Sequence, residues 1–143
     1  MSTSSLYFAV SLVLVLVALS HVSNAEAATV NDAPKIAKAT IAAIMGRDPS
    51  IISVKEHTEK GVYYLDYIRQ DDKTRWAFLC KLEGDRVIWA GAGSPDNPNY
   101  VGRWRTHPED EVITYRIQNG DVIIRQQFTD GSASEKIFKL DRL

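Results

Sequence analysis

The chain has 143 residues, and its 17 lysines and arginines against 18 aspartates and glutamates give a formal net charge of −1 at pH 7. This balance argues against a nucleic-acid-binding protein, because such proteins usually carry an excess of basic residues. The single cysteine, Cys80, excludes an internal disulfide, so the fold has to be stabilised by packing. The length fits one small domain that follows a short leader.

An apolar run, Leu6 to Leu19, lies near the N-terminus. It is shorter than the roughly 20 residues of a membrane-spanning helix and has the length of the apolar part of a secretory signal. Ala25-Glu26-Ala27 then offers a cleavage site. We therefore predict a signal peptide over residues 1–27, a domain over residues 28–143, and a periplasmic or secreted location with no stable membrane span. A retained anchor is the alternative, because residues 1–5 contain no lysine or arginine.

Residues 32–46 have the pattern of one amphipathic helix. Large apolar side chains recur three or four positions apart between Ile36 and Met45. Asp32 is suited to cap the N-terminus, and Gly46 is suited to end the helix. Asp48-Pro49 prevents the helix from continuing.

The rest of the chain has the patterns of short strands joined by tight turns. Asn119-Gly120, between two apolar runs, is a strong hairpin signal. Consecutive hairpins give antiparallel neighbours, so we predict an α+β fold in which one N-terminal helix packs on an antiparallel meander of about six to seven strands. The predicted strands are residues 51–57, 62–69, 75–82, 86–90, 112–117, 122–128 and 135–140.

A long irregular segment, residues 91–109, interrupts the meander. Loops of this length inside compact domains are uncommon and are often functional. We expect Arg103-Trp104-Arg105 to form a brief strand with the tryptophan turned inward, and we interpret the whole segment as part of a binding site. The candidate binding residues of this segment are Arg103, Trp104, Arg105 and His107.

Strand alternation suggests a second candidate surface. Trp76, Phe78, Cys80, Trp89 and Phe128 have the parity that we assign to the inner face of the sheet, which predicts a buried, structural cysteine. The opposite parity carries cations for which the sequence offers few neighbouring acids, and arginine is well suited to bind carboxylate or phosphate. This face predicts an acidic protein partner or an anionic small ligand. Its cations are Arg75, Lys81, Arg86, Arg116 and Arg125.

The order of leader, helix and meander, with Gly102-Arg-Trp-Arg leading into the strand of Tyr115, is similar to small exported proteins of Gram-negative bacteria whose function is uncharacterised. The layout also resembles cystatin-like folds. The resemblance covers most of the chain after the leader and implies no activity and no catalytic residues.

We predict a non-catalytic binding module, acting as an inhibitor, an accessory subunit or a ligand carrier, in the form of a monomer or a homodimer. The alternative is a small hydrolase or isomerase in which His107 is the general base. Metal-binding, phosphate-binding and nucleophile motifs are absent from the sequence, so we assign no catalytic residue, metal ion or cofactor.

Overall fold

In the computed structural model, which describes residues 25–93, 97 and 99–143, an antiparallel sheet wraps around the helix α1 (Ala33–Met45). The strands lie side by side in chain order, which confirms the predicted α+β meander. The run Leu6–Leu19, predicted to belong to a signal peptide, lies outside the described residues. The strands are β1 (Ser53–Glu56), β2 (Val62–Ile68), β3 (Arg75–Glu83), β4 (Arg86–Ala92), β5 (Val112–Gln118), β6 (Asp121–Gln127) and β7 (Ala133–Lys139).

The ends of α1 follow the predicted signals, with one difference at the N-terminus. Gly46 adopts a left-handed conformation, with φ of 60°, and ends the helix as predicted. Asp32 immediately precedes α1, but its carboxylate accepts hydrogen bonds from the backbone N–H and the hydroxyl of Thr29. The reason is that Asp32 itself ends a short 3₁₀ turn, Val30–Asp32, and its side chain closes that turn instead of capping the helix.

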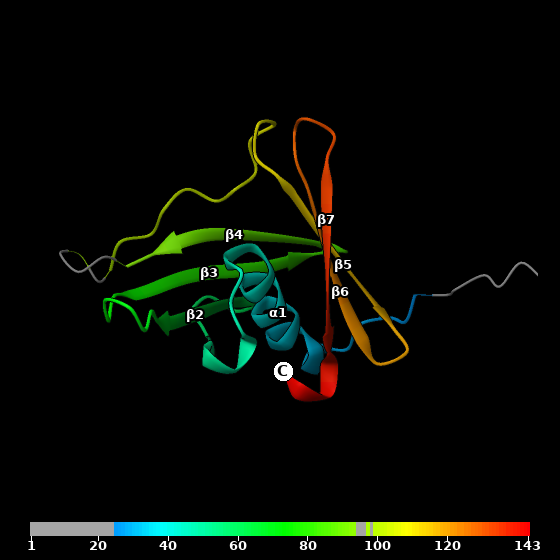
Figure 1. Ribbon diagram of the computed structural model, residues 1–143, viewed down its shortest axis with the longest axis horizontal. Coiled ribbons are helices and arrows are strands. Elements are labelled where there is room, and N and C mark those ends of the chain that lie inside the picture. Colours follow the sequence, from blue (N-terminus) through cyan, green and yellow to red (C-terminus); the bar gives the residue numbers. More distant parts are fainter. Residues whose placement is uncertain (1–24, 94–96, 98) are drawn as a thin grey trace, which may run out of the picture.

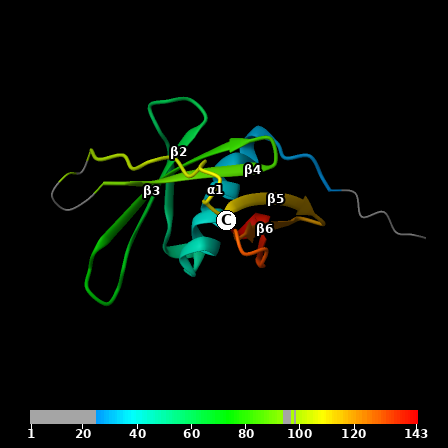
Figure 2. The ribbon, with the colours of Figure 1, turned by 90° about the horizontal axis from the view of Figure 1, so that it is seen from above.

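The sheet folds sharply between β4 and β5. These two strands pair only at Arg86 and Thr114, whereas the other neighbours pair over most of their length. As a result β2–β4 and β5–β7 form two walls that cross at an angle, with α1 between them (Figure 1). The view from above shows the same two walls on either side of the helix (Figure 2). The helix is therefore enclosed on several sides, not laid across one flat face.

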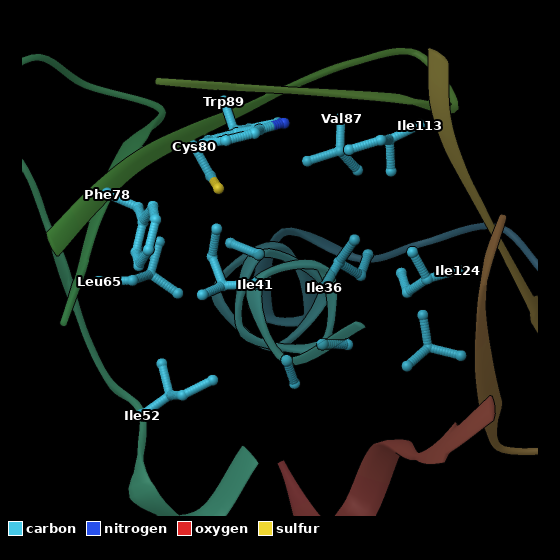
Figure 3. Packing of buried hydrophobic residues seen from close by; sticks show 14 of the residues in the cluster. Ile36, Ile41, Ile52, Leu65, Phe78, Cys80, Val87, Trp89, Ile113 and Ile124 are labelled. Atoms are coloured by element: carbon cyan, nitrogen blue, oxygen red, sulfur yellow. The ribbon is translucent and has the colours of Figure 1, made fainter. Parts of the chain in front are cut away.

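The hydrophobic core surrounds α1 (Figure 3). Ile41 of the helix points toward the wall that carries Phe78 and Cys80, and Ile36 points toward the wall that carries Ile113 and Ile124. Small buried residues allow strands to approach the helix closely. These small helix residues are Ala37, Ala39 and Ala42, and each is almost fully buried.

The predicted inward parity is confirmed for most of the sheet. Cys80 is fully buried, and this burial raises the pKa of its thiol well above the usual range. Two aromatic residues that share this parity are not buried: Trp76 and Phe128 are each 40% exposed. Phe128 lies just past the end of β6. Trp76 lies near Met45, where α1 ends and no longer covers the concave face of the sheet.

Candidate ligand-binding cleft

The segment between β4 and β5 folds back along the edge of β4. The N–H of Gly102 donates to the carbonyl of Gly91 at 2.8 Å, and the N–H of Arg105 donates to the carbonyl of Trp89 at 2.9 Å. A side chain at position 102 would bring its Cβ to 3.1 Å from the carbonyl oxygen of Gly91, so this close approach favours glycine. The backbone thus follows β4, although residues 103–105 do not form the regular strand that we predicted.

Trp104 packs on the outer face of the sheet, so the prediction that it turns inward to the core is wrong. Its ring covers a small apolar cluster that includes Val62 and Leu79. The ammonium of Lys81 lies 5.0 Å from the centre of the indole ring. The concave face opposite Val62 and Leu79 is occupied by α1 and its core contacts, whereas the outer face of β2 and β3 carries apolar side chains that the tryptophan can cover.

Asp110 anchors the end of this segment. Its nearly buried carboxylate accepts two hydrogen bonds from Arg103, at 2.6 and 2.8 Å, and one from the backbone N–H of His107, at 2.8 Å. The Arg103 guanidinium holds the pKa of this carboxyl well below its usual range. A side-chain nitrogen of Arg105 lies 3.7 Å from the same carboxylate. These contacts fix where the backbone of residues 103–110 runs.

A cleft of about 370 Å³ opens on the concave face beyond the end of α1. Its floor includes Gly91 of β4, and Met45 closes it on the side of the helix. The other walls are predominantly aromatic. The aromatic lining residues are Trp76, Phe78, Trp89 and Tyr100.

Contacts behind the cleft hold its inner aromatic wall in place. The ring of Trp89 packs edge-on against Phe78, with 6.0 Å between ring centres. The indole N–H of Trp89 donates to a carboxylate oxygen of Glu111 at 3.2 Å. Phe78 and Glu111 therefore restrict the orientation of the Trp89 ring, and this part of the wall is formed before any ligand binds.

Two arginines from the two predicted surfaces line the same cleft. Arg75, at the start of β3, forms an ion pair with Asp66 of β2. Arg105 lies with its guanidinium carbon 4.7 Å from the centre of the Trp89 ring. Among the described residues that line the cleft, none carries a carboxylate. Residues of both predicted surfaces thus line one cleft, although the guanidinium of Arg75 is paired with Asp66 and only that of Arg105 lies against an aromatic ring of the lining.

His107 does not line this cleft. Its side chain is 59% exposed, and its Nδ1 accepts a hydrogen bond from the N–H of Glu109 at 3.2 Å. The carboxylate of Glu109 is 3.8 Å from the same nitrogen. The alternative hypothesis, in which His107 is a general base, stays a prediction, and none of these contacts favours it.

The remaining predicted cations do not form one repelling basic surface, because acids that strand parity did not place among them neutralise most of them. Glu135 of β7 accepts hydrogen bonds from Arg116 at 2.9 and 3.3 Å and lies 3.6 Å from Arg125. Lys81 pairs with Glu83 at 3.1 Å. Arg86 begins β4 where the sheet bends, opposite Thr114 of β5. This bend separates the cations of β3 from those of β5 and β6.

Sequence reasoning missed Trp76, Trp89 and Tyr100 as site residues, since it assigned the two tryptophans to the core.

The described part of the chain contains no helix that is long and apolar enough to cross a membrane. In residues 25–93, 97 and 99–143, no group of three histidine, cysteine or acidic side chains is arranged to hold a metal ion. No protein-family model, curated protein or solved structure matches this chain.

Proposed function

We propose that the protein is an exported, non-catalytic binding module that carries a small apolar ligand in the cleft between β3, β4 and the end of α1. The observation that carries this proposal is the uncovered end of the concave face, where Trp76 is 40% exposed although it has the parity of a core residue. Apolar surface rimmed by polar groups is typical of ligand-binding grooves.

The dimensions of the cleft support a small ligand. Its volume of about 370 Å³ lies in the usual range of small-molecule sites. The exposed rings of Trp76 and Tyr100 offer a ligand apolar area that water otherwise covers. A carrier fits these features better than an inhibitor or an accessory subunit, because both of those roles use larger protein–protein surfaces.

Filling the cleft from its floor tests the proposal. A Cβ at Gly91 would meet no atom within 4 Å, so Gly91→Phe places a ring in the cleft without a clash at the backbone. We expect the purified protein to bind the neutral fluorescent probe N-phenyl-1-naphthylamine, and we expect Gly91→Phe to weaken this binding by about tenfold or more. Fluorescence titration measures the affinity, and circular dichroism checks the fold.

Ser134→Phe is the matched control, because it adds the same ring to an exposed position on β7, away from the cleft. We expect this variant to bind the probe like the wild type. Equal binding by the wild type and a folded Gly91→Phe variant would show that the probe does not use the cleft. Failure of the wild type to bind any apolar probe would reject the proposed carrier function.

A further inference from the structure

The chemistry of the cleft walls indicates a particular class of ligand, and this inference rests on the proposed function. We propose that the cleft selects a planar aromatic carboxylic acid, whose ring lies among the aromatic side chains while its carboxylate binds Arg105. The aromatic side chains in question are Trp76, Phe78, Trp89 and Tyr100.

The shape preference follows from the lining. Aromatic rings form most of the apolar wall, and flat rings pack well against flat ligands in offset or edge-on arrangements. The geometry of Trp89 is set by Phe78 on one side and by Glu111 at its indole N–H. A rigid aromatic wall should bind a rigid planar ligand more tightly than a flexible aliphatic one, because the flexible ligand loses conformational freedom on binding.

The charge preference follows from Arg105. Its side chain is 41% exposed, and its closest contact with a carboxylate, 3.7 Å to Asp110, is too long for a hydrogen bond. Asp110 already accepts its short hydrogen bonds from Arg103 and from the N–H of His107. No described residue accepts a hydrogen bond from the Arg105 guanidinium, so its donors can bind a ligand carboxylate in bidentate fashion.

A cationic ligand is the less suitable class, although aromatic walls can also bind ammonium groups. Arginines already occupy positions near two of the rings, with Arg69 at 5.4 Å from the centre of Trp76 and Arg105 at 4.7 Å from that of Trp89. The guanidinium of Arg75 is paired with Asp66, and the described lining residues include no acid to attract an ammonium group. Charge complementarity therefore favours an anion.

Probes of similar size that differ in charge or in planarity distinguish an aromatic acid from the other ligand classes. Calorimetric titration of the purified protein would compare 1-naphthoate, 1-naphthalenemethanol and 1-naphthylmethylammonium, with octanoate as the aliphatic acid. We expect 1-naphthoate to bind about tenfold more tightly than the alcohol, because a hydrogen-bonded ion pair adds to the apolar contact. The ammonium compound and octanoate are expected to bind more weakly than 1-naphthoate. Added salt is expected to weaken the binding of the two carboxylates and to leave that of the alcohol unchanged, because it screens the attraction between a carboxylate and Arg105.

Arg105→Gln is the decisive variant. We expect it to lower the affinity for 1-naphthoate by about tenfold and to leave the affinity for the alcohol within about twofold of the wild-type value. Arg105→Lys should retain part of the preference for the acid, since it keeps the charge but loses the planar fork. Arg125→Gln is the matched control, because Arg125 is 43% exposed and lies 3.6 Å from a carboxylate that it shares with a second arginine.

The outcomes distinguish this inference from the proposed function. Equal binding of the acid and the alcohol, or tighter binding of the ammonium compound, would overturn the ligand class while leaving the carrier function intact. An equal loss of both acid and alcohol in Arg105→Gln would show that Arg105 shapes the cleft and does not read charge, which also overturns the inference. If none of the naphthyl probes binds the wild type, the carrier function itself is wrong.

Discussion

Trp89→Ala is expected to destabilise the protein by about 3–5 kcal/mol, as the truncation of large buried aromatic residues does. The side chain is only 8% exposed and contacts three groups at once. Its ring packs on Phe78, its N–H is hydrogen-bonded to Glu111, and Arg105 covers its face. We also expect this variant to lose binding of the naphthyl probes. Urea denaturation followed by circular dichroism measures the change in the free energy of unfolding.

Trp76→Ala is the comparison that separates stability from binding. Trp76 is much more exposed than Trp89, so its truncation should cost about 1 kcal/mol or less. It should nevertheless remove most of the probe affinity, because the ring lines the cleft. A Trp89→Ala variant as stable as the wild type would contradict the described core. A Trp76→Ala variant that binds normally would contradict the described site.

Asp110→Asn is expected to release the segment between β4 and β5 and to change how stability depends on pH. The folded protein lowers the pKa of this carboxyl, chiefly through the hydrogen bonds from Arg103. A group whose pKa is depressed on folding stabilises the protein above its unfolded pKa, which is near 3.9 for aspartate. This stabilisation is therefore present at neutral pH and is lost as the pH falls below about 4, toward the folded pKa.

The measurement is the difference in thermal midpoint between the wild type and Asp110→Asn as a function of pH. We expect this difference to be largest at neutral pH and to shrink in acid, and a difference that does not vary with pH would contradict the role of the carboxylate. Hydrogen exchange at the amides of Gly102 and Arg105, which bond to β4, should be faster in the variant. Asp72→Asn is the control for the exchange measurement. Asp72 also pairs with an arginine, Arg69, but belongs to the β2–β3 turn, so its replacement should leave the exchange of these two amides unchanged.

Much of the fold could be predicted because its signals are local. The spacing of apolar residues and the glycine at position 46 define α1, and Asn119-Gly120 adopts positive φ at both residues, as its hairpin requires. Strand alternation predicts which residues point toward the helix. The fold of the sheet between β4 and β5 has no local signal, because it depends on how two walls close around a helix that carries several buried alanines.

The site was predicted only in part. Arg75 and Arg105 were candidates from residue type and position, and both line the cleft. The aromatic wall was missed because parity shows which face a side chain occupies and not whether anything covers it there. A helix of 13 residues is roughly 20 Å long, whereas the nine residues of β3 extend for roughly 30 Å. Because α1 also crosses the strands instead of running along them, it leaves part of the concave face of β3 uncovered (Figure 3).

The prediction of one basic surface failed for a different physical reason. Glu135 belongs to β7, and its position between Arg116 and Arg125 depends on the register of three strands. Parity counted within each strand identified the outward side but did not reveal the acid that neutralises it. Charge balance on a sheet face is thus a property of strand pairing, which a single strand does not encode.

The most direct test of the proposed cleft uses the three tryptophans of the chain as reporters. Trp76 and Trp89 line the cleft, whereas Trp104 packs on the outer face of the sheet. In a ¹⁵N-labelled protein, with each indole signal assigned by a single Trp→Phe replacement, 1-naphthoate should shift the Nε1–H resonances of Trp76 and Trp89 in a saturable way and leave that of Trp104 in place. A saturable shift confined to Trp104, or no saturable shift at all, would contradict the proposal.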